Sequence, residues 1–243
     1  NYNTYTIKID RYNLSMFNLI ENSAQIPHGT YVEIIEDYFT DSLDVDKSLF
    51  ITNSSIVNTD CTPLGLYISE NQTIRQTNYG NGNGNFYLKP NGAILIGKKN
   101  VTICKTDEIA QNLNNNVRIG LQSGPMLVHN NTINKNFGIN STNKHIRSGV
   151  GIYSTNSNEK FLVFAISLDE VNFYDFSSLF LNKFKCENAL CIESAGSLMN
   201  IPYLDNVNDY SQNVVCNYLV YKSFPMEASG TGFAISSDGY IVT

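Results

Sequence analysis

The chain has 243 residues, a formal net charge of -6 and a pI near 5.0. This length is enough for a full hydrophobic core, in one large domain or two small ones. The sequence contains no run of basic residues, which argues against nucleic acid and anionic membranes as partners. No apolar stretch approaches the length of a membrane span, so we expect none.

The first residue indicates how the chain was processed, and the cysteines indicate which cofactors it could hold. The chain starts with asparagine rather than methionine, so we expect it to have been processed or trimmed. Five cysteines without a CxxC pair, and three histidines, argue against structural zinc, and we predict no metal or other cofactor. The odd count leaves open free buried thiols, or one or two disulfides with a thiol left over. An extended strand between Cys186 and Cys191 would hold them too far apart to bridge.

The N-terminal half has the pattern of short strands joined by polar turns. The first two predicted strands, over residues 5–10 and 14–20, are expected to pair with each other. Residues 78–85 are rich in glycine and asparagine and predict a flexible loop with positive φ angles. A hairpin is predicted around the turn at residues 89–92. The remaining strands of this half are predicted over residues 45–51, 64–69 and 73–76.

Two helices are predicted in the second half. The first spans residues 106–113, with Thr106 as its N-cap. The second spans residues 172–184, and its phenylalanine stripe favours core packing over a ligand groove. Because hairpins separate the helices, we predict an α+β fold with two main helices and a largely antiparallel or mixed sheet. Its strands are predicted over residues 119–121, 126–128, 150–153, 161–166, 189–192 and 214–221. Residues 73–76 are expected to return along 64–69, residues 150–153 and 161–166 to form a hairpin, and the turn at 130–131 to reverse the chain after 126–128.

Three segments join a strand-like apolar run to a bend made by Gly, Pro or Asn. They are residues 84–92 (GNFYLKPNG), 122–128 (QSGPMLV) and 145–152 (HIRSGVGI). Each leaves a polar side chain at the bend, as expected where strands present a site on their loops. Their order and spacing resemble the phosphodiester glycosidase family, whose best-known member uncovers mannose 6-phosphate by removing a capping N-acetylglucosamine. The resemblance covers about residues 48–203 and implies both the fold and the location of the site.

Cleavage of a sugar-1-phosphodiester requires groups that hold the phosphate, exchange a proton and orient the sugar. Arg147 is predicted to grip the phosphate with its planar fork, and the alternative is a structural ion pair. Ser123 and Gly124 indicate an anion- or hydroxyl-binding turn, the alternative being an ordinary strand connection. Asn85 and Asn91 are predicted to orient sugar hydroxyls, unless they serve only the geometry of their turns.

Two segments depart from the family pattern. Family members carry an Asp-Gly pair after the strand equivalent to residues 189–192, whereas this chain has Glu193 followed by Ser194. The family segment Thr-Asn-Ala-Gly corresponds to residues 52–55, which have lost the glycine. A carboxylate displaced by about 1 Å can cost roughly a hundredfold in rate, so these changes indicate drift or retuning. Glu193 is predicted as general acid or base, or else is a solvated carboxylate, and Asn53 and Ser197 are predicted to bind substrate.

The last fourteen residues have a different character. Residues 230–243 have the pattern strand, Ser-Asp-Gly turn, strand, which resembles the opening hairpin of a trypsin-like serine protease of the high-temperature-requirement type. We therefore predict a phosphodiester glycosidase-like domain over residues 1–222, a linker over 223–229 and a truncated protease start over 230–243. The alternative is a final hairpin of the first domain. The scattered histidines form no protease triad.

Three functions follow as hypotheses. The first is a secreted, periplasmic or cell-surface hydrolase acting on a phosphodiester-linked sugar. The second is a non-catalytic module that binds a glycan or a phospho-ligand and accompanies a serine protease. The third is a plain interaction domain. The expected partners are a carbohydrate or sugar-phosphate ligand and a covalently linked protease domain, and the first two hypotheses require Arg147 and Glu193 to lie near one cleft.

Overall fold

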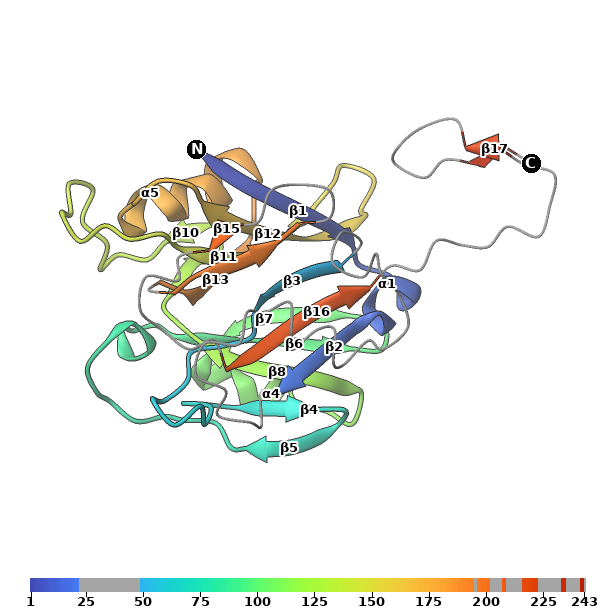
Figure 1. Cartoon of the computed structure of the whole chain (residues 1–243), viewed down its shortest axis with the longest axis horizontal. Helices are drawn as coiled ribbons and strands as arrows, with labels where there is room; N and C mark the ends of the chain where they lie inside the picture. Colours follow the sequence, from blue (N-terminus) through green and yellow to red (C-terminus); the bar gives the residue numbers. More distant parts are fainter. Residues whose placement is uncertain are drawn as a thin grey trace.

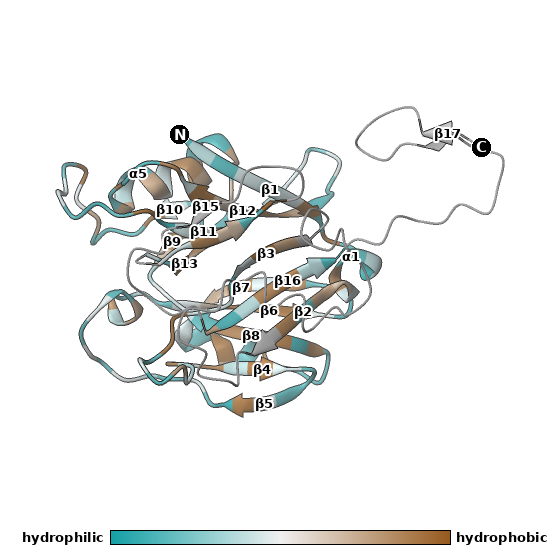
Figure 2. Cartoon of the chain, viewed as in Figure 1, coloured by the Kyte–Doolittle hydropathy of each residue, from teal (hydrophilic) through white to brown (hydrophobic). Residues whose placement is uncertain are grey.

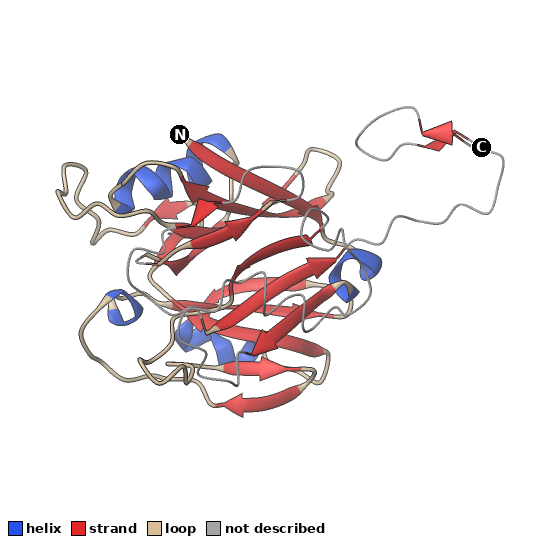
Figure 3. Cartoon of the chain, in the orientation of Figure 1, coloured by secondary structure: helices blue, strands red, loops and turns tan. Residues whose placement is uncertain are grey.

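The computed structural model describes residues 1–21, 49–194, 196–201, 207–208, 216–222, 233–234 and 241–242. Within these residues the chain forms three larger sheets and one two-stranded sheet, whose strand pairs are antiparallel. Figure 3 shows that strands dominate and that the helices are few and short. The prediction of largely antiparallel sheet is confirmed, but the helices contribute less than the α+β prediction implied.

The three larger sheets lie together in the main body of the molecule (Figure 1). The six-stranded sheet has the order β1 (Tyr2–Lys8), β12 (Lys160–Ser167), β11 (Ser148–Ser154), β13 (Asn188–Glu193), β9 (Met126–His129) and β10 (Thr132–Ile133). A five-stranded sheet has the order β15 (Val207–Asn208), β14 (Leu198–Asn200), β3 (Leu49–Asn53), β16 (Asn217–Lys222) and β2 (Phe17–Glu21). The other five-stranded sheet has the order β5 (Gln72–Arg75), β4 (Tyr67–Ser69), β8 (Val117–Ser123), β6 (Gly92–Gly97) and β7 (Val101–Lys105).

Short helices cover the outer faces and the turns. Their bounds are α1 (Arg11–Ser15), the 3₁₀ turns η1 (Asn85–Tyr87) and η2 (Thr106–Glu108), α4 (Ile109–Asn112), α5 (Phe173–Ser178) and the π-helical turn η3 (Leu179–Lys183). α5 begins where the Asn172 side chain accepts a hydrogen bond of 2.8 Å from the Asp175 N–H. The predicted helix over residues 106–113 thus forms a 3₁₀ turn followed by α4. The predicted helix over residues 172–184 forms α5 followed by a π-helical turn.

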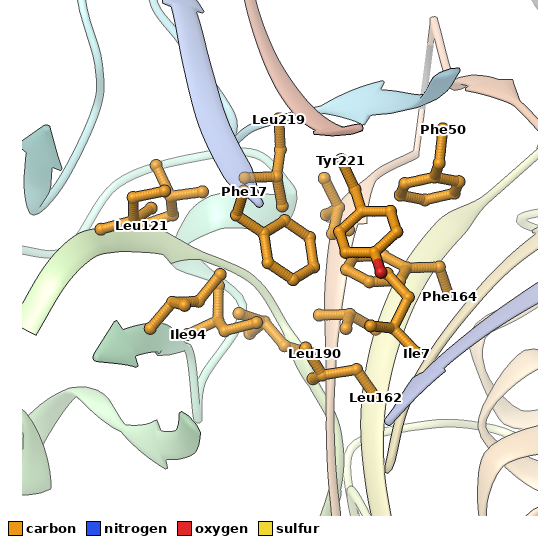
Figure 4. Packing of buried hydrophobic residues seen from close by; sticks show 14 of the residues in the cluster. Ile7, Phe17, Phe50, Ile94, Leu121, Leu162, Phe164, Leu190, Leu219 and Tyr221 are labelled. Carbon is orange, nitrogen blue, oxygen red and sulfur yellow. The ribbon is translucent and has the colours of Figure 1, made fainter. Parts of the chain in front are cut away.

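One central hydrophobic core joins all three larger sheets. Figure 4 shows Phe17, Phe50, Phe164 and Tyr221 packed together from β2, β3, β12 and β16. The Phe50 and Phe164 ring centroids are 4.8 Å apart, and those of Phe17 and Tyr221 are 5.1 Å apart. Figure 2 shows hydrophobic colour mainly in the strands and hydrophilic colour mainly in the loops. This shared core fixes the sheets relative to one another, and with them the loops at their edges.

A second cluster lies between the six-stranded sheet and α5. Phe176 and Phe180 are fully buried there and Phe173 is nearly so. The core-packing interpretation of this stripe is therefore confirmed. Gly151 of β11 is required beneath it, because a Cβ at that position would lie 2.7 Å from Cys186 Sγ and 2.8 Å from the Phe180 ring.

Several predicted pairings are confirmed and two are wrong. β4 pairs with β5, β9 with β10 and β11 with β12, as the sequence predicted. The first strand pairs with β12 rather than with residues 14–20, because Asp10 caps α1 and turns the chain away. β6 pairs with β7 and β8 rather than with residues 87–88, because the backbone there bonds locally in η1. Both errors concern partners that are distant in sequence.

The cysteines divide into one disulfide and three free thiols. Cys61 and Cys216 are bridged, and Cys104, Cys186 and Cys191 are free and buried. This fits the predicted mixture of bridged and reduced cysteines, including the unbridged pair at Cys186 and Cys191. Near the end of the chain, β17 (Phe233–Ala234) pairs with β18 (Ile241–Val242). The predicted linker at residues 223–229 lies outside the described residues.

Candidate functional site

Two of the predicted site residues bind the segment that follows β13. The Asn53 side chain holds it at two points: Nδ2 donates to Gly196 O at 3.2 Å, and Oδ1 accepts from Leu198 N–H at 2.7 Å. The Asn85 Nδ2 donates to the Ser194 hydroxyl. Gly196 has a φ of 96°, which only glycine adopts without strain. The segment is therefore shaped by one glycine and by two amides from distant strands and turns.

Two further predicted residues fix the strands on either side of this segment. The Ser123 hydroxyl at the end of β8 donates to Ile192 O at 3.0 Å. The Ser197 hydroxyl donates to Ile146 O at 3.1 Å, close to the start of β11. Both serines are buried. Because β8 and β13 belong to different sheets, the site lies where these sheets meet (Figure 1).

Glu193 ends β13 and is half-buried. It faces Ser148 across the antiparallel pair of β11 and β13. Its Oε1 accepts a hydrogen bond of 2.7 Å from the N–H of Ser194. The Glu193 carboxylate thus lies at the end of a buried strand and is oriented by a backbone N–H. Such a position suits a group that exchanges protons.

Arg147 is more deeply buried than an arginine that binds phosphate at the protein surface would be. Its side chain has no exposed area. Nε donates to Val171 O at 2.8 Å, Nη2 donates to Asn143 O at 3.0 Å, and Cζ lies 3.6 Å from the centre of the Phe173 ring. Burial lowers the pKa of Arg147 from its usual value. Nη1 is buried and has no hydrogen-bond partner among the described residues, so this nitrogen remains for a ligand.

The backbones of Arg147 and Glu193 come close together. Arg147 directly precedes β11, and its neighbour Ser148 is the residue that faces Glu193. Both charges also act on the buried thiol of Cys191. Burial raises the pKa of that thiol, Arg147 lowers it and Glu193 raises it further. The backbone positions of the two residues are therefore adjacent, and both charges act on one thiol.

Three further buried hydroxyls, those of Ser54, Ser55 and Ser148, were not predicted as ligands. Ser54 and Ser55 follow Asn53 at the end of β3, and Ser148 faces Glu193. Their Oγ atoms have no hydrogen-bond partner within the described part of the chain. Buried hydroxyls are normally paired, so unpaired ones are candidates for binding a ligand. In the sequence, these serines could have been noticed because Ser54 and Ser55 lie in the segment at residues 52–55 and Ser148 lies in the motif at residues 145–152.

Asn91 and Gly124 contact each other and the turn at η1. The Asn91 Nδ2 donates to Phe86 O at 2.8 Å, and its Oδ1 accepts from Thr106 Oγ1 at 2.7 Å. A Cβ on Gly124 would lie 2.7 Å from Asn91 Cβ, so the glycine allows close packing there. Asn91 also lines a depression of about 450 Å³ together with Tyr79, Lys89, Lys105 and other residues. Asn91 and Gly124 therefore stabilise the turns at residues 86–91 and 123–125.

No group of three or more His, Cys, Asp or Glu side chains is placed to hold a metal ion within the described residues. The site as described therefore consists of a carboxylate, a guanidinium and hydroxyl groups. Such groups can bind an oxyanion and transfer a proton at its bridging oxygen.

Two solved structures have a fold similar to that of this chain. The zebrafish N-acetylglucosamine-1-phosphodiester alpha-N-acetylglucosaminidase catalytic domain, auto-inhibited by its pro-peptide, matches with a TM-score of 0.53 and 14% identity over 92% of this chain and 83% of that chain. A hypothetical protein from Synechocystis matches with a TM-score of 0.51 and 13% identity over 91% and 59% of the two chains. At these identities the likeness concerns the fold alone.

Sequence comparisons agree with the fold. The uncharacterized protein YigE of Escherichia coli strain K12 is 33% identical over 147 residues, which make up 60% of this chain and 56% of YigE. The matched part thus spans little more than half of that relative. The phosphodiester glycosidase family model matches residues 46–214, a span that contains every predicted site residue. With more than half of its length matched and with the same fold, this chain belongs to the phosphodiester glycosidase family.

Proposed function

We propose that this domain hydrolyses the bond between C1 of a sugar and a phosphodiester, releasing the free sugar and a phosphate monoester. One observation carries the proposal: within a domain of this family, Glu193 ends β13 opposite Ser148, the residue that follows Arg147, and Arg147 Nη1 and the Ser148 hydroxyl are buried without a partner among the described residues. Water supplies the oxygen that C1 gains, and its proton passes to the site or to the departing phosphate. The reaction needs no other reactant.

Glu193 is the group proposed to exchange the proton. The end of a buried strand holds its carboxylate at the site, and its position opposite Ser148 brings it close to Arg147. General acid or base catalysis by a positioned carboxylate contributes typically about 10²–10⁴-fold to a rate. Glutamate in place of the aspartate of other family members extends the side chain by one methylene, and the substrate of this chain is expected to match the longer reach.

Arg147 and Ser148 are proposed to bind the phosphate. Arg147 retains the two N–H donors of its buried Nη1, and Ser148 retains its hydroxyl. A donor that is already desolvated and held in place binds an oxyanion without the cost of reorganisation. Arg147 therefore acts through one fixed nitrogen rather than as the two-pronged clamp that the sequence predicted. Its other contacts hold the guanidinium in position.

The remaining predicted residues are proposed to position the segment after β13. The side chains of Asn53, Asn85, Ser123 and Ser197 bind that segment or the strand end beside it, and so hold Glu193 in place. Asn91 and Gly124 shape the neighbouring turns. Ser54 and Ser55 supply unpaired hydroxyls that are suited to binding the sugar. The amide of Asn53, which was predicted to bind substrate, is occupied by the segment after β13.

A secreted, periplasmic or cell-surface location is part of the proposal. The Cys61–Cys216 disulfide is typical of proteins in an oxidising compartment. No helix among the described residues is long and apolar enough to cross a membrane. The attached protease also remains a proposal, which rests on the sequence of residues 230–243. In the gene, a histidine codon within a few positions after Thr243 would support it.

Binding without cleavage is the second candidate. It is favoured by the hydrogen bond that Glu193 Oε1 accepts from the N–H of the next residue, which occupies the carboxylate locally. A domain of this kind would bind a glycan or phospho-ligand at the same site. The two candidates differ in turnover but not in affinity.

Turnover of sugar-1-phosphodiesters separates the candidates. The assay follows release of the free sugar from a panel of N-acetylglucosamine and other sugar 1-phosphodiesters. We expect Glu193→Gln to lower kcat by about 10²-fold or more with little change in KM. Arg147→Lys is expected to lower kcat/KM by about tenfold or more, because an ammonium cannot replace the held guanidinium. Glu187→Gln, an exposed carboxylate next to β13, is the matched control.

Binding measurements complete the test. Saturable binding of the panel without turnover in the wild type would favour the second candidate. Turnover that is unchanged in both Glu193→Gln and Arg147→Lys would overturn the site assignment. Thermal unfolding of each variant shows whether it folds.

A further inference from the structure

A second concave site lies away from the segment after β13. A pocket of about 760 Å³ is formed by α1, β2, β8 and the turns that follow β4 and β6. Its lining contains no residue of the proposed catalytic site. It combines cationic, acidic and polar side chains, among them Arg11, Lys98, Arg118, Glu70, Tyr12 and Asn18.

Arg118 provides a fixed guanidinium in this pocket. Its side chain is only 12% exposed. Nη2 donates to Leu14 O at 2.9 Å and to Phe17 O at 2.6 Å, and Nη1 lies 2.5 Å from Glu70 Oε1. A guanidinium has five N–H donors, so these three contacts leave two of them for a ligand. A guanidinium that is already oriented and largely desolvated favours an oxyanion.

Two further cations at the pocket lack partners. Arg11 and Lys98 are exposed, and neither side chain forms a hydrogen bond or an ion pair with the described residues. With Arg118 they give three positive charges against the single negative charge of Glu70. An excess of two positive charges is thus gathered in one pocket of a chain whose net charge is -6. A doubly charged anion would match this excess.

We infer that this pocket binds a phosphorylated sugar through its phosphate group. The phosphate supplies the matching charge and the oxygen acceptors for Arg11, Lys98 and Arg118. The volume falls within the range of about 300–1,000 Å³ that is typical of small-molecule sites, which is more than a phosphate needs. Tyr12, which is 48% exposed, offers a ring face against which the sugar can pack. The inference does not depend on the proposed hydrolysis.

Calorimetric titration at low salt, in a buffer free of phosphate, tests the inference. The probes are glucose 6-phosphate, inorganic phosphate and glucose. We expect glucose 6-phosphate to bind most tightly, phosphate to bind more weakly and glucose not to bind. The double variant Arg11→Gln/Lys98→Gln is expected to weaken binding of glucose 6-phosphate by about tenfold or more. Both replaced side chains are exposed and unpaired, so the variant should fold as the wild type does.

Two matched variants locate the binding. Lys99→Gln removes an exposed lysine that is adjacent in sequence but does not line the pocket, and it should change the affinity by less than about twofold. Arg147→Lys, which changes the residue proposed to bind phosphate at the catalytic site, should leave this binding unchanged, and this result separates the two sites. Equal binding by wild type and the double variant, or no saturable binding of either phosphate probe, would overturn the inference. Equal affinities for phosphate and glucose 6-phosphate would overturn the part that concerns the sugar.

Discussion

The side-chain carbonyl of Asn53 accepts a hydrogen bond of 2.7 Å from the backbone N–H of Leu198, a residue 145 positions further along the chain. The same amide donates to Gly196 O at 3.2 Å. One buried side chain at the end of β3 thus satisfies two backbone groups of the segment that follows Glu193. The position of the proposed catalytic carboxylate therefore depends on the bonds between the end of β3 and the segment that joins β13 to β14.

Asn53→Asp is expected to disturb this segment. The carboxylate can still accept from Leu198 N–H but cannot donate to Gly196 O, and it would place a negative charge against that carbonyl. We expect a loss of about 1–3 kcal/mol in the free energy of unfolding and a lower kcat with little change in KM. Urea denaturation and turnover measure the two effects. Asn131→Asp, in an exposed turn, should change neither, and equal behaviour of the two variants would refute the interaction.

Arg118→Ala is expected to destabilise the junction between α1, β2 and β8. The substitution leaves Leu14 O and Phe17 O, which belong to two fully buried residues, without their donor. We expect a loss of about 2–4 kcal/mol in urea denaturation, with only partial recovery in Arg118→Lys. Arg75→Ala, at an exposed position of β5, is the control. A loss no larger than that of the control would contradict this account.

Thiol counting should find three free cysteines out of five. In the oxidised protein Cys104, Cys186 and Cys191 are buried, and burial raises the pKa of Cys104 and Cys186 to about 12. We therefore expect almost no alkylation of the folded protein near neutral pH, three modified cysteines after unfolding and five after unfolding with a reductant. Mass spectrometry distinguishes these states. Five modified cysteines without a reductant would show that the disulfide is absent in solution.

Loss of the Cys61–Cys216 disulfide should lower stability substantially. The bridge joins residues 155 positions apart, and closing a loop of that size removes much entropy from the unfolded chain. The chain-entropy argument gives about 4–5 kcal/mol for the double variant Cys61→Ser/Cys216→Ser. Urea denaturation of the oxidised wild type and the variant measures the difference. Equal midpoints would mean that the bridge does not constrain the unfolded state.

His129 should make stability depend on pH. Burial lowers its pKa below the usual 6.5, and Glu108 opposes this effect only in part. The unfolded chain therefore binds the proton more readily, so stability is fully present above pH 6.5 and is lost as the pH falls through the lowered pKa. We expect the wild type to lose more stability than His129→Gln between about pH 7.5 and about pH 5.5. An equal loss in both proteins would rule out this role.

Local patterns in the sequence predicted much of the fold. The hairpin of β11 and β12, the buried strand β13 and the phenylalanine face of α5 follow from alternation, helical spacing and turn residues, which act over a few positions. The motifs at residues 84–92, 122–128 and 145–152 also marked the region of the site. Strand partners that are distant in sequence could not be predicted in this way, because the pairing of β1 with β12 depends on which strand edge is unpaired once the sheets form.

The sequence by itself determined which side chains are available for chemistry: a carboxylate at a strand end, an arginine in a motif and serines where glycines are expected. Only the tertiary structure decided how they are used. Arg147 contacts Phe173 and the carbonyls of Asn143 and Val171, which leaves a single nitrogen unpaired among the described residues. Burial and hydrogen-bond pairing are set by residues far apart in the chain, and spacing along the sequence does not contain them.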